Sequence, residues 1–206
     1  MTFWKKRPRD PHEATRAEYS ELREQARKAT MPADRARLQN LAGDLALTIG
    51  DEAGALSALG EALDIYLRDR DYHSARAVAR KLLRVRSKTV RVRSTLAWLA
   101  IAQEFAGDAR VALDLYVGSL ATPGDRQYAI KHLTAMAAAT RDRELRTAIA
   151  DHLADLGERD AAAAIMLRLQ SEESGELDPP DDREIRARWE DALDQLVSPA
   201  GERSAR

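Results

Sequence analysis

The stretch "LAWLAIAQEFAGDARVALDLYVGSLATPGD", residues 96–125, decides the fold. Two Ala-rich apolar runs flank the pair Gly107-Asp108, and Ala112 and Tyr116 follow that glycine at five and nine residues. Apolar residues at this spacing line one side of a helix on each side of the pair. A glycine can end one helix in the left-handed conformation, and an aspartate can cap the next. The stretch therefore predicts a helix–turn–helix hairpin.

The same pattern recurs along the chain. Gly50 and Gly157 are each followed by an acidic residue, and weaker copies without glycine begin at Arg70 and Thr140. From Arg70 to Gly107 the spacing is 37 residues, and from Gly107 to Thr140 it is 33, a period typical of stacked helical hairpins. Small residues after each bend let antiparallel helices approach closely. The alanines expected at these contacts are Ala55, Ala75, Ala112 and Ala162.

Residues 89–123 contain a more specific motif. Trp98 and Ala100 fall on the first helix, the Gly-Asp pair forms the turn, and Pro123 starts the next unit. This order is similar to that of the tetratricopeptide repeat. The resemblance implies an all-α fold, a right-handed superhelical stack of about five antiparallel hairpins near residues 12–50, 51–87, 88–123, 124–156 and 157–197. It also implies an adaptor or scaffold whose concave surface binds a peptide or helix of a partner protein.

Composition shifts divide the chain further. We expect a disordered basic N-terminus over 1–11, a repeat domain over 12–170, an acidic loop over 171–182, a helix over 183–197 and a disordered tail over 198–206. The apolar stripe of that last helix would either cap the open end of the stack or dock on another chain. Its members are Ile185, Trp189, Leu193 and Leu196.

The sequence carries no motif of an enzyme or a metal site. It has no cysteine, which excludes disulfides, zinc-thiolate sites and thiol catalysis. Its four histidines lack metal-ligand spacing, and no phosphate-binding glycine loop occurs. No apolar run is long enough for a membrane span and no signal peptide is recognisable, so we expect a cytoplasmic protein without catalytic residues, metal or cofactor.

The strongest electrostatic feature is a basic ridge without an acidic residue between Tyr72 and Gln103. Its members at helical spacing, with two more past the next turn, are Arg76, Arg80, Arg84, Arg91 and Arg93. Three interpretations stay open: a solvated face, a binding surface for an acidic peptide or protein, and a surface for nucleic acid or anionic lipid. The lack of aromatic residues within the ridge disfavours nucleic acid, whose bases stack on such rings.

Other partners remain open as well. The acidic residues of 171–182 could fold back on the basic ridge and compete with an outside ligand. Phe3 and Trp4, followed by four basic residues, resemble a weak interfacial membrane contact. The chain could instead be a structural subunit of a larger assembly, docked through its last helix. The sequence leaves the oligomeric state undetermined.

Overall fold

A computed structural model describes residues 12–87 and 89–197, with side chains described up to residue 192. Within these ranges the chain forms ten α-helices and no strand, which confirms the prediction of an all-α fold. The helices belong to two compact units, Met1–Val85 and Arg86–Arg206. The predicted N-terminal membrane contact and the C-terminal tail lie outside the described residues.

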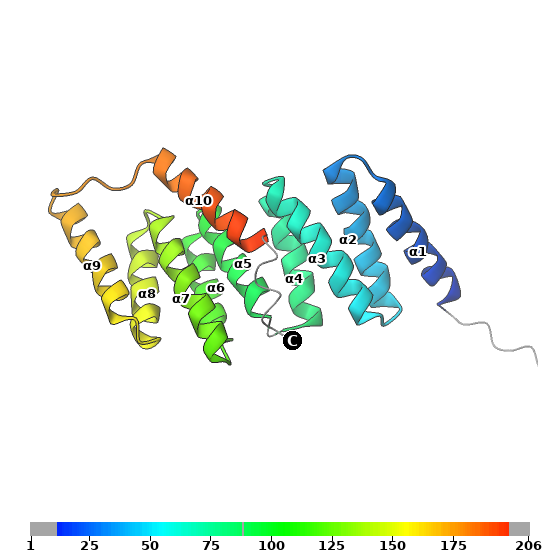
Figure 1. The fold of residues 1–206 in the computed structure, drawn as a ribbon, viewed down its shortest axis with the longest axis horizontal. Coiled ribbons are helices and arrows are strands. Elements are labelled where there is room, and N and C mark those ends of the chain that lie inside the picture. The colour runs from blue at the N-terminus through cyan, green and yellow to red at the C-terminus, as the bar shows by residue number, and fades with distance from the viewer. Residues whose placement is uncertain (1–11, 88, 198–206) are drawn as a thin grey trace, which may run out of the picture. The chain divides into compact units, whose positions relative to one another are not determined.

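Unit 1 contains four helices joined by connections of three residues (Figure 1). They are α1 (Glu13–Lys28), α2 (Pro32–Thr48), α3 (Glu52–Arg68) and α4 (Tyr72–Val85). Pro32 opens α2, where its missing N–H costs no hydrogen bond. Asp51 caps α3, because its carboxylate accepts from the backbone N–H of Gly54 at 2.9 Å. Each helix packs on the next along the chain.

Small residues bring the helices of unit 1 together. Ala55 and Ala75, predicted at the close contacts, are both completely buried. Gly43 on α2 allows a still closer approach, since a Cβ atom at this position would lie 2.6 Å from the side chain of Leu59 on α3. The α2–α3 contact therefore depends on a glycine that the repeat pattern did not identify.

Unit 2 contains six helices (Figure 1). They are α5 (Val90–Ala102), α6 (Ala106–Val117), α7 (Pro123–Ala138), α8 (Arg143–Asp155), α9 (Arg159–Glu173) and α10 (Asp182–Val197). Thr122 and Asp125 form a capping box at the start of α7, and the carboxylate of Asp142 caps α8. From α5 to α9, neighbouring helices pack through α5–α6, α5–α7, α6–α8, α7–α8 and α8–α9 contacts.

The bend between α5 and α6 differs from the prediction. Gly107 is the second residue of α6, and the left-handed position belongs to Glu104, with φ of 56°. The equivalent residues are Gly50, Arg70 and Gly157, all with positive φ. Counting five residues from Glu104 leads to Ala109, which is completely buried, whereas Ala112 is half-buried. The predicted register at Gly107 was therefore wrong by three residues.

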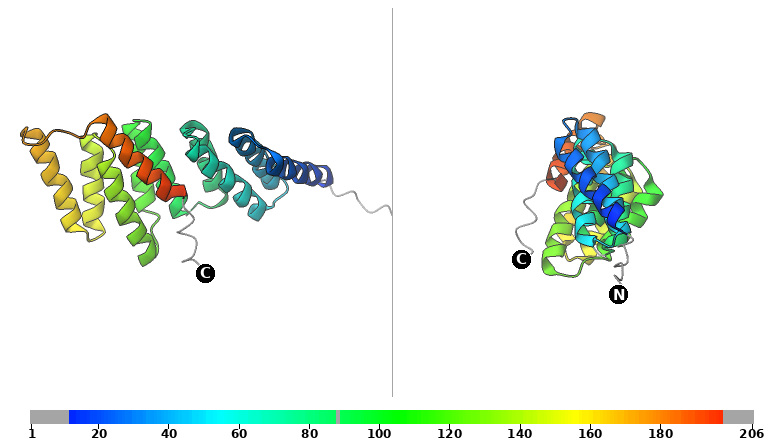
Figure 2. Two further views of the ribbon diagram at one scale, coloured as in Figure 1. Left: turned by 45° about the horizontal axis from the view of Figure 1, so that its top comes forward. Right: turned by 90° about the vertical axis from the view of Figure 1, so that its right-hand side faces the viewer.

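The last helix does not form a fifth hairpin. Instead of packing along α9, α10 packs on α7 and α5 (Figures 1 and 2). Residues 174–181 lead the chain from the end of α9 to the start of α10, and Gly175 in this segment has a φ of 76°. Of the two roles expected for this helix, capping would require it to cover α9, yet it packs on α7 and α5, and Leu167 on α9 remains 64% exposed. Helix α9 also continues through Glu173, so the acidic loop is shorter than predicted.

Candidate functional site

The basic ridge is divided between the two units. Arg76, Arg80 and Arg84 lie on α4 in unit 1. Arg80 and Arg84 are exposed and have no hydrogen bond or ion pair with the described residues. Between them Lys81 binds the carboxylate of Asp44, with an Nζ to Oδ2 distance of 2.7 Å. One part of α4 is thus neutralised by α2, and two arginines remain open to solvent.

Arg91 and Arg93 lie on α5 in unit 2, and the contacts described for them are with residues of that unit. Arg93 donates to the backbone carbonyl of Ser87 through Nε at 3.0 Å and Nη2 at 2.7 Å, and to that of Leu115 at 3.3 Å. Burial raises the pKa of the Tyr128 phenol on α7, and the charge of Arg91 opposes this shift. Arg93 therefore fastens the start of α5 to backbone carbonyls, which commits its donors within the unit.

The most specific contact surface of unit 2 is the side of α5 and α7 that carries α10. We call it the α5/α7 face, and its centre is Trp98, which is 1% exposed. Trp189 of α10 meets Trp98 edge to face, with ring centroids 4.8 Å apart and an interplanar angle of 70°. Such a geometry places the positive edge of one ring against the negative face of the other. Ala192, three residues later, is 2% exposed and lets the helix backbone approach.

A buried histidine forms a hydrogen bond with the indole of Trp98. The indole Nε1 donates to Nδ1 of His132 on α7 at 3.2 Å. His132 is buried, and this burial, with a smaller effect of Lys131, lowers its pKa to about 4. The imidazole is therefore neutral at pH 7, with its proton on Nε2 and Nδ1 free to accept. This hydrogen bond fixes the orientation of Trp98 at the centre of the face.

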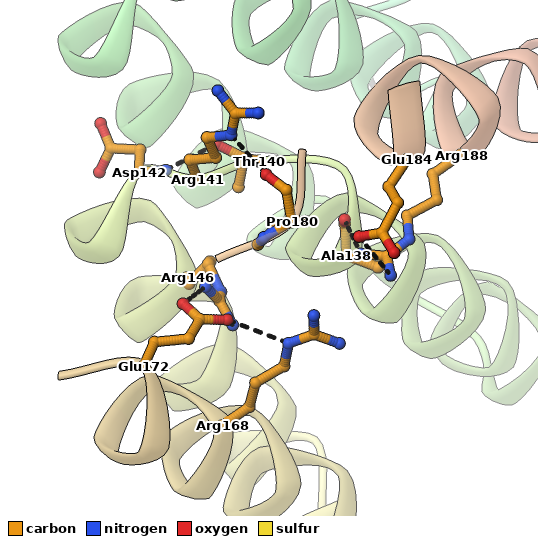
Figure 3. A network of polar contacts seen from close by, with 10 residues as sticks. All are labelled: Ala138, Thr140, Arg141, Asp142, Arg146, Arg168, Glu172, Pro180, Glu184 and Arg188. Atoms are coloured by element: carbon orange, nitrogen blue, oxygen red, sulfur yellow. Dashed lines mark hydrogen bonds and ion pairs between the residues drawn. The ribbon is translucent and has the colours of Figure 1, made fainter. Parts of the chain in front are cut away.

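Two arginines tie α10 and its linker to the connection between α7 and α8 (Figure 3). Arg188 donates to the carbonyl of Ala138 at 2.6 Å, at the C-terminal end of α7 where carbonyls lack helical partners. Arg141 donates to the carbonyl of Pro180 at 2.6 Å and pairs with Asp182 at 2.8 Å. The linker and α10 are therefore held in place through two backbone carbonyls, one ion pair and one pair of aromatic rings.

A partly buried ion cluster, with Arg146 at its buried end, joins α8 to α9 beside these contacts (Figure 3). Glu172 accepts from Arg146 at 2.5 and 3.1 Å and from Nε of Arg168 at 3.0 Å. The hydrogen bond from Arg146 is the main reason why the pKa of Glu172 is lowered. Glu173 pairs with Arg143 at 2.7 Å on the surface. These carboxylates of the predicted acidic loop, like Asp182, thus pair with arginines of unit 2.

A pocket of about 230 Å³ lies between α7, α8, α9 and α10, with Pro180 of the linker on its wall. Ala137, Ala138, Ala161 and Ala164 line much of it, and Arg146, Arg168 and Arg188 add polar groups to the lining. Small-molecule sites usually measure about 300–1,000 Å³. The smaller volume and the alanine lining suit an apolar side chain of a bound segment better than a cofactor.

Sequence reasoning placed some of these residues and missed others. It placed Trp98 on the first helix of the motif, and Ile185 and Trp189 on one stripe of the last helix. Both stripe residues are half-buried, and Trp189 contacts Trp98. The side chains of Leu193 and Leu196 lie outside the described ones. The roles of Arg141 and Arg188 were missed, because contacts with carbonyls far along the chain leave no periodic signal.

No family model, curated protein or solved structure matches this chain. In the ranges that the structure describes, no group of histidine and acidic side chains is arranged to hold a metal ion. None of the described helices combines the length and hydrophobicity that a membrane crossing requires.

Proposed function

We propose that the chain is a protein–protein interaction adaptor whose α5/α7 face binds a helix or peptide of a partner protein. In this proposal the helical hairpins stack as in tetratricopeptide repeats, and the first helices of successive hairpins line the binding surface. The observation that carries the proposal is the presence of α10 on this face, since a helix outside the hairpin series is held there by the indole of Trp98 on α5 and the backbone carbonyl of Ala138 on α7.

The chemistry of the face supports protein recognition over catalysis. Its donor Arg141 binds a backbone carbonyl of the linker, a group that every polypeptide supplies, and its own carbonyl at Ala138 accepts from an arginine of the docked helix. Its aromatic centre provides the kind of anchor that dominates binding energy at protein interfaces. The adjoining pocket has room for one more side chain of a bound segment. Together these features would read an extended segment followed by an amphipathic helix.

The exposed arginines of α4 support a second, electrostatic contact. Arg80 and Arg84 project from one helix at a spacing of four residues. Such a pair accelerates the approach of an acidic partner more than it strengthens the final complex. Arg76, Arg80 and Arg84 are therefore proposed to steer the partner, with the specific contacts made on unit 2.

A site-specific cross-linking experiment in the native cell tests the proposal. A photoreactive residue replaces Thr134, an exposed residue of α7 on the wall of the pocket, or Val111, an exposed residue of α6. We expect one partner protein to be captured from position 134 and not from position 111. Equal capture from both positions, or none from position 134, would remove the α5/α7 face as a binding surface.

A variant of the basic ridge completes the test. Replacement of Arg76, Arg80 and Arg84 by glutamate should reduce the yield of the adduct formed at position 134, and when the cross-linking is repeated in a cell lysate the reduction should be stronger at low salt. An unchanged yield would confine recognition to unit 2 and would return the ridge to the role of a solvated surface.

A further inference from the structure

Helix α10 is buried much less than the helices on which it lies. Within Asp182–Ala192, only Ala192 is buried, and Ile185, Arg188 and Trp189 are half-buried. Helix α5, in contrast, buries eight residues. Because the packing from α5 to α9 does not include α10, the removal of this helix would leave those contacts in place.

The connection to α10 also makes it independent of the stack. Eight residues, 174–181, separate it from α9, whereas the other described connections of unit 2 that lie between its helices have three to five. The linker is held by Arg141 through the carbonyl of Pro180, at the point where α10 begins. Release of Trp189, Arg188 and Arg141 would thus free the helix and uncover Trp98 without breaking a hairpin.

We propose that α10 is a resident occupant of the α5/α7 face, and that an amphipathic helix of a partner protein with the same contact pattern displaces it. This inference rests on the proposed function and adds the chemistry of the partner and the regulation of the site. The partner helix carries a large aromatic residue for Trp98, an arginine directly before it and a small residue three positions after it.

Each element of this pattern follows from a contact that α10 makes. The aromatic residue is needed because only a ring presents an edge to the indole of Trp98. The arginine is needed because the carbonyl of Ala138 stands at the negative end of the α7 dipole and has Arg188 as its donor. The small residue is needed because Ala192 is 2% exposed, which leaves no room for a larger side chain.

The docked α10 lowers the apparent affinity with which a partner helix binds the α5/α7 face. A segment tethered by a short linker competes at an effective concentration on the order of millimolar. A partner therefore binds the wild-type chain with an apparent affinity reduced by the small fraction of molecules whose α10 is released. Weakening the docking of α10 removes this reduction without altering the face itself.

The test uses the full-length protein and a fluorescent peptide of residues 178–197 as the probe. Its binding is measured by fluorescence anisotropy with wild type, with Trp189→Glu and with Ala187→Glu. Position 187 is exposed on the same helix, so the second variant is a matched control for the added charge. We expect the peptide to bind the Trp189→Glu protein at least roughly tenfold more tightly than wild type. The Ala187→Glu control should bind the peptide with the same affinity as wild type.

Variant peptides test the contact pattern. A peptide with Trp189→Glu and a peptide with Arg188→Glu should each bind the Trp189→Glu protein roughly tenfold more weakly than the original peptide. A peptide with Ala187→Glu should bind like the original. Equal binding of all four peptides would overturn the assigned chemistry of the partner.

A second measurement on the wild type does not depend on the folding of a variant. Hydrogen exchange of the backbone amides is followed with and without an excess of unlabelled peptide. Displacement predicts faster exchange in α10 and unchanged exchange in α7, whereas unchanged exchange in α10 at saturating peptide would overturn displacement.

The outcomes separate this inference from the proposed function. Equal peptide affinity for wild type and Trp189→Glu would overturn the role of α10 as occupant, while the face would remain a helix-binding site. No binding to either protein, with the variant shown to be helical by circular dichroism, would overturn both. A concentration-dependent wild-type dimer that Trp189→Glu dissolves would assign the face to α10 of a second copy and overturn displacement by another protein.

Discussion

The indole of Trp189 meets the indole of Trp98 edge to face, with 4.8 Å between the ring centroids, although α5 opens unit 2 and α10 closes it. The two rings differ in burial, since Trp98 is 1% exposed and Trp189 is half-buried. This asymmetry makes one ring part of the core and the other its ligand.

Substitution of the two tryptophans should show this asymmetry in the free energy of unfolding. Trp98→Ala should cost about 3–5 kcal/mol, the usual value for a buried aromatic residue. Trp189→Ala should cost clearly less, because only the docking of α10 is lost. A double-mutant cycle in urea should give a coupling of about 0.5–1.5 kcal/mol. Additive effects would show that the rings do not interact in solution.

The ion cluster around Glu172 should be far more sensitive to substitution than its surface neighbour. Glu172→Gln leaves the buried Arg146 without a carboxylate and should destabilise the protein by about 3–5 kcal/mol. Glu173→Gln breaks an exposed pair with Arg143 and should cost less than about 1 kcal/mol. Urea unfolding of both variants measures the difference, and similar losses would contradict the assigned burial.

The bend between α5 and α6 should be stabilised by a glycine at its left-handed position. Glu104 holds φ of 56°, which costs a residue with a Cβ atom roughly 1–2 kcal/mol. Glu104→Gly should therefore raise the melting temperature. Gly107→Ala should leave it unchanged or slightly higher, because Gly107 is helical and a Cβ atom there meets nothing within 4 Å. A marked loss of stability in Gly107→Ala would restore Gly107 as the cap.

The buried His132 should make the protein less stable in mild acid. Its pKa is about 4 in the folded protein, below the ordinary value of 6.5. Between these values the unfolded chain binds a proton that the folded chain excludes, so stability falls as the pH is lowered from about 6.5 toward 4, by up to about 3 kcal/mol. Urea unfolding at several pH values measures this slope. His132→Gln should remove it and the exposed His73→Gln should not.

Local patterns predicted the helices and their caps well. Pro123 and the alanines Ala55 and Ala75 act as the sequence suggested, because helix starts and close packing depend on neighbours within a few residues. The Gly-Asp pair misled the register at one bend, since glycine is also tolerated in the first turn of a helix and Glu104 gave no signal of its strained φ.

The site itself was only partly predictable. The apolar stripe of α10 indicated that Trp189 would be covered, but helical periodicity carries no information on which surface covers it. The direction of the linker decides this, and it depends on Gly175 and on the bond from Arg141 to the carbonyl of Pro180. The basic ridge was a real cluster of charge along the sequence, yet Arg93 is bound to backbone carbonyls, which charge spacing alone does not reveal.

The bond from Arg188 to the carbonyl of Ala138 has a consequence for how this surface can evolve. Its acceptor belongs to the main chain, and the backbone N–H of Asp142, which a longer helix would have offered to that carbonyl, is engaged by Thr140 at 3.1 Å. No side-chain substitution in α7 removes the acceptor. Any sequence with this fold therefore keeps a preference for a cation beside the carbonyl of Ala138. A change in binding specificity must come from other residues of the α5/α7 face.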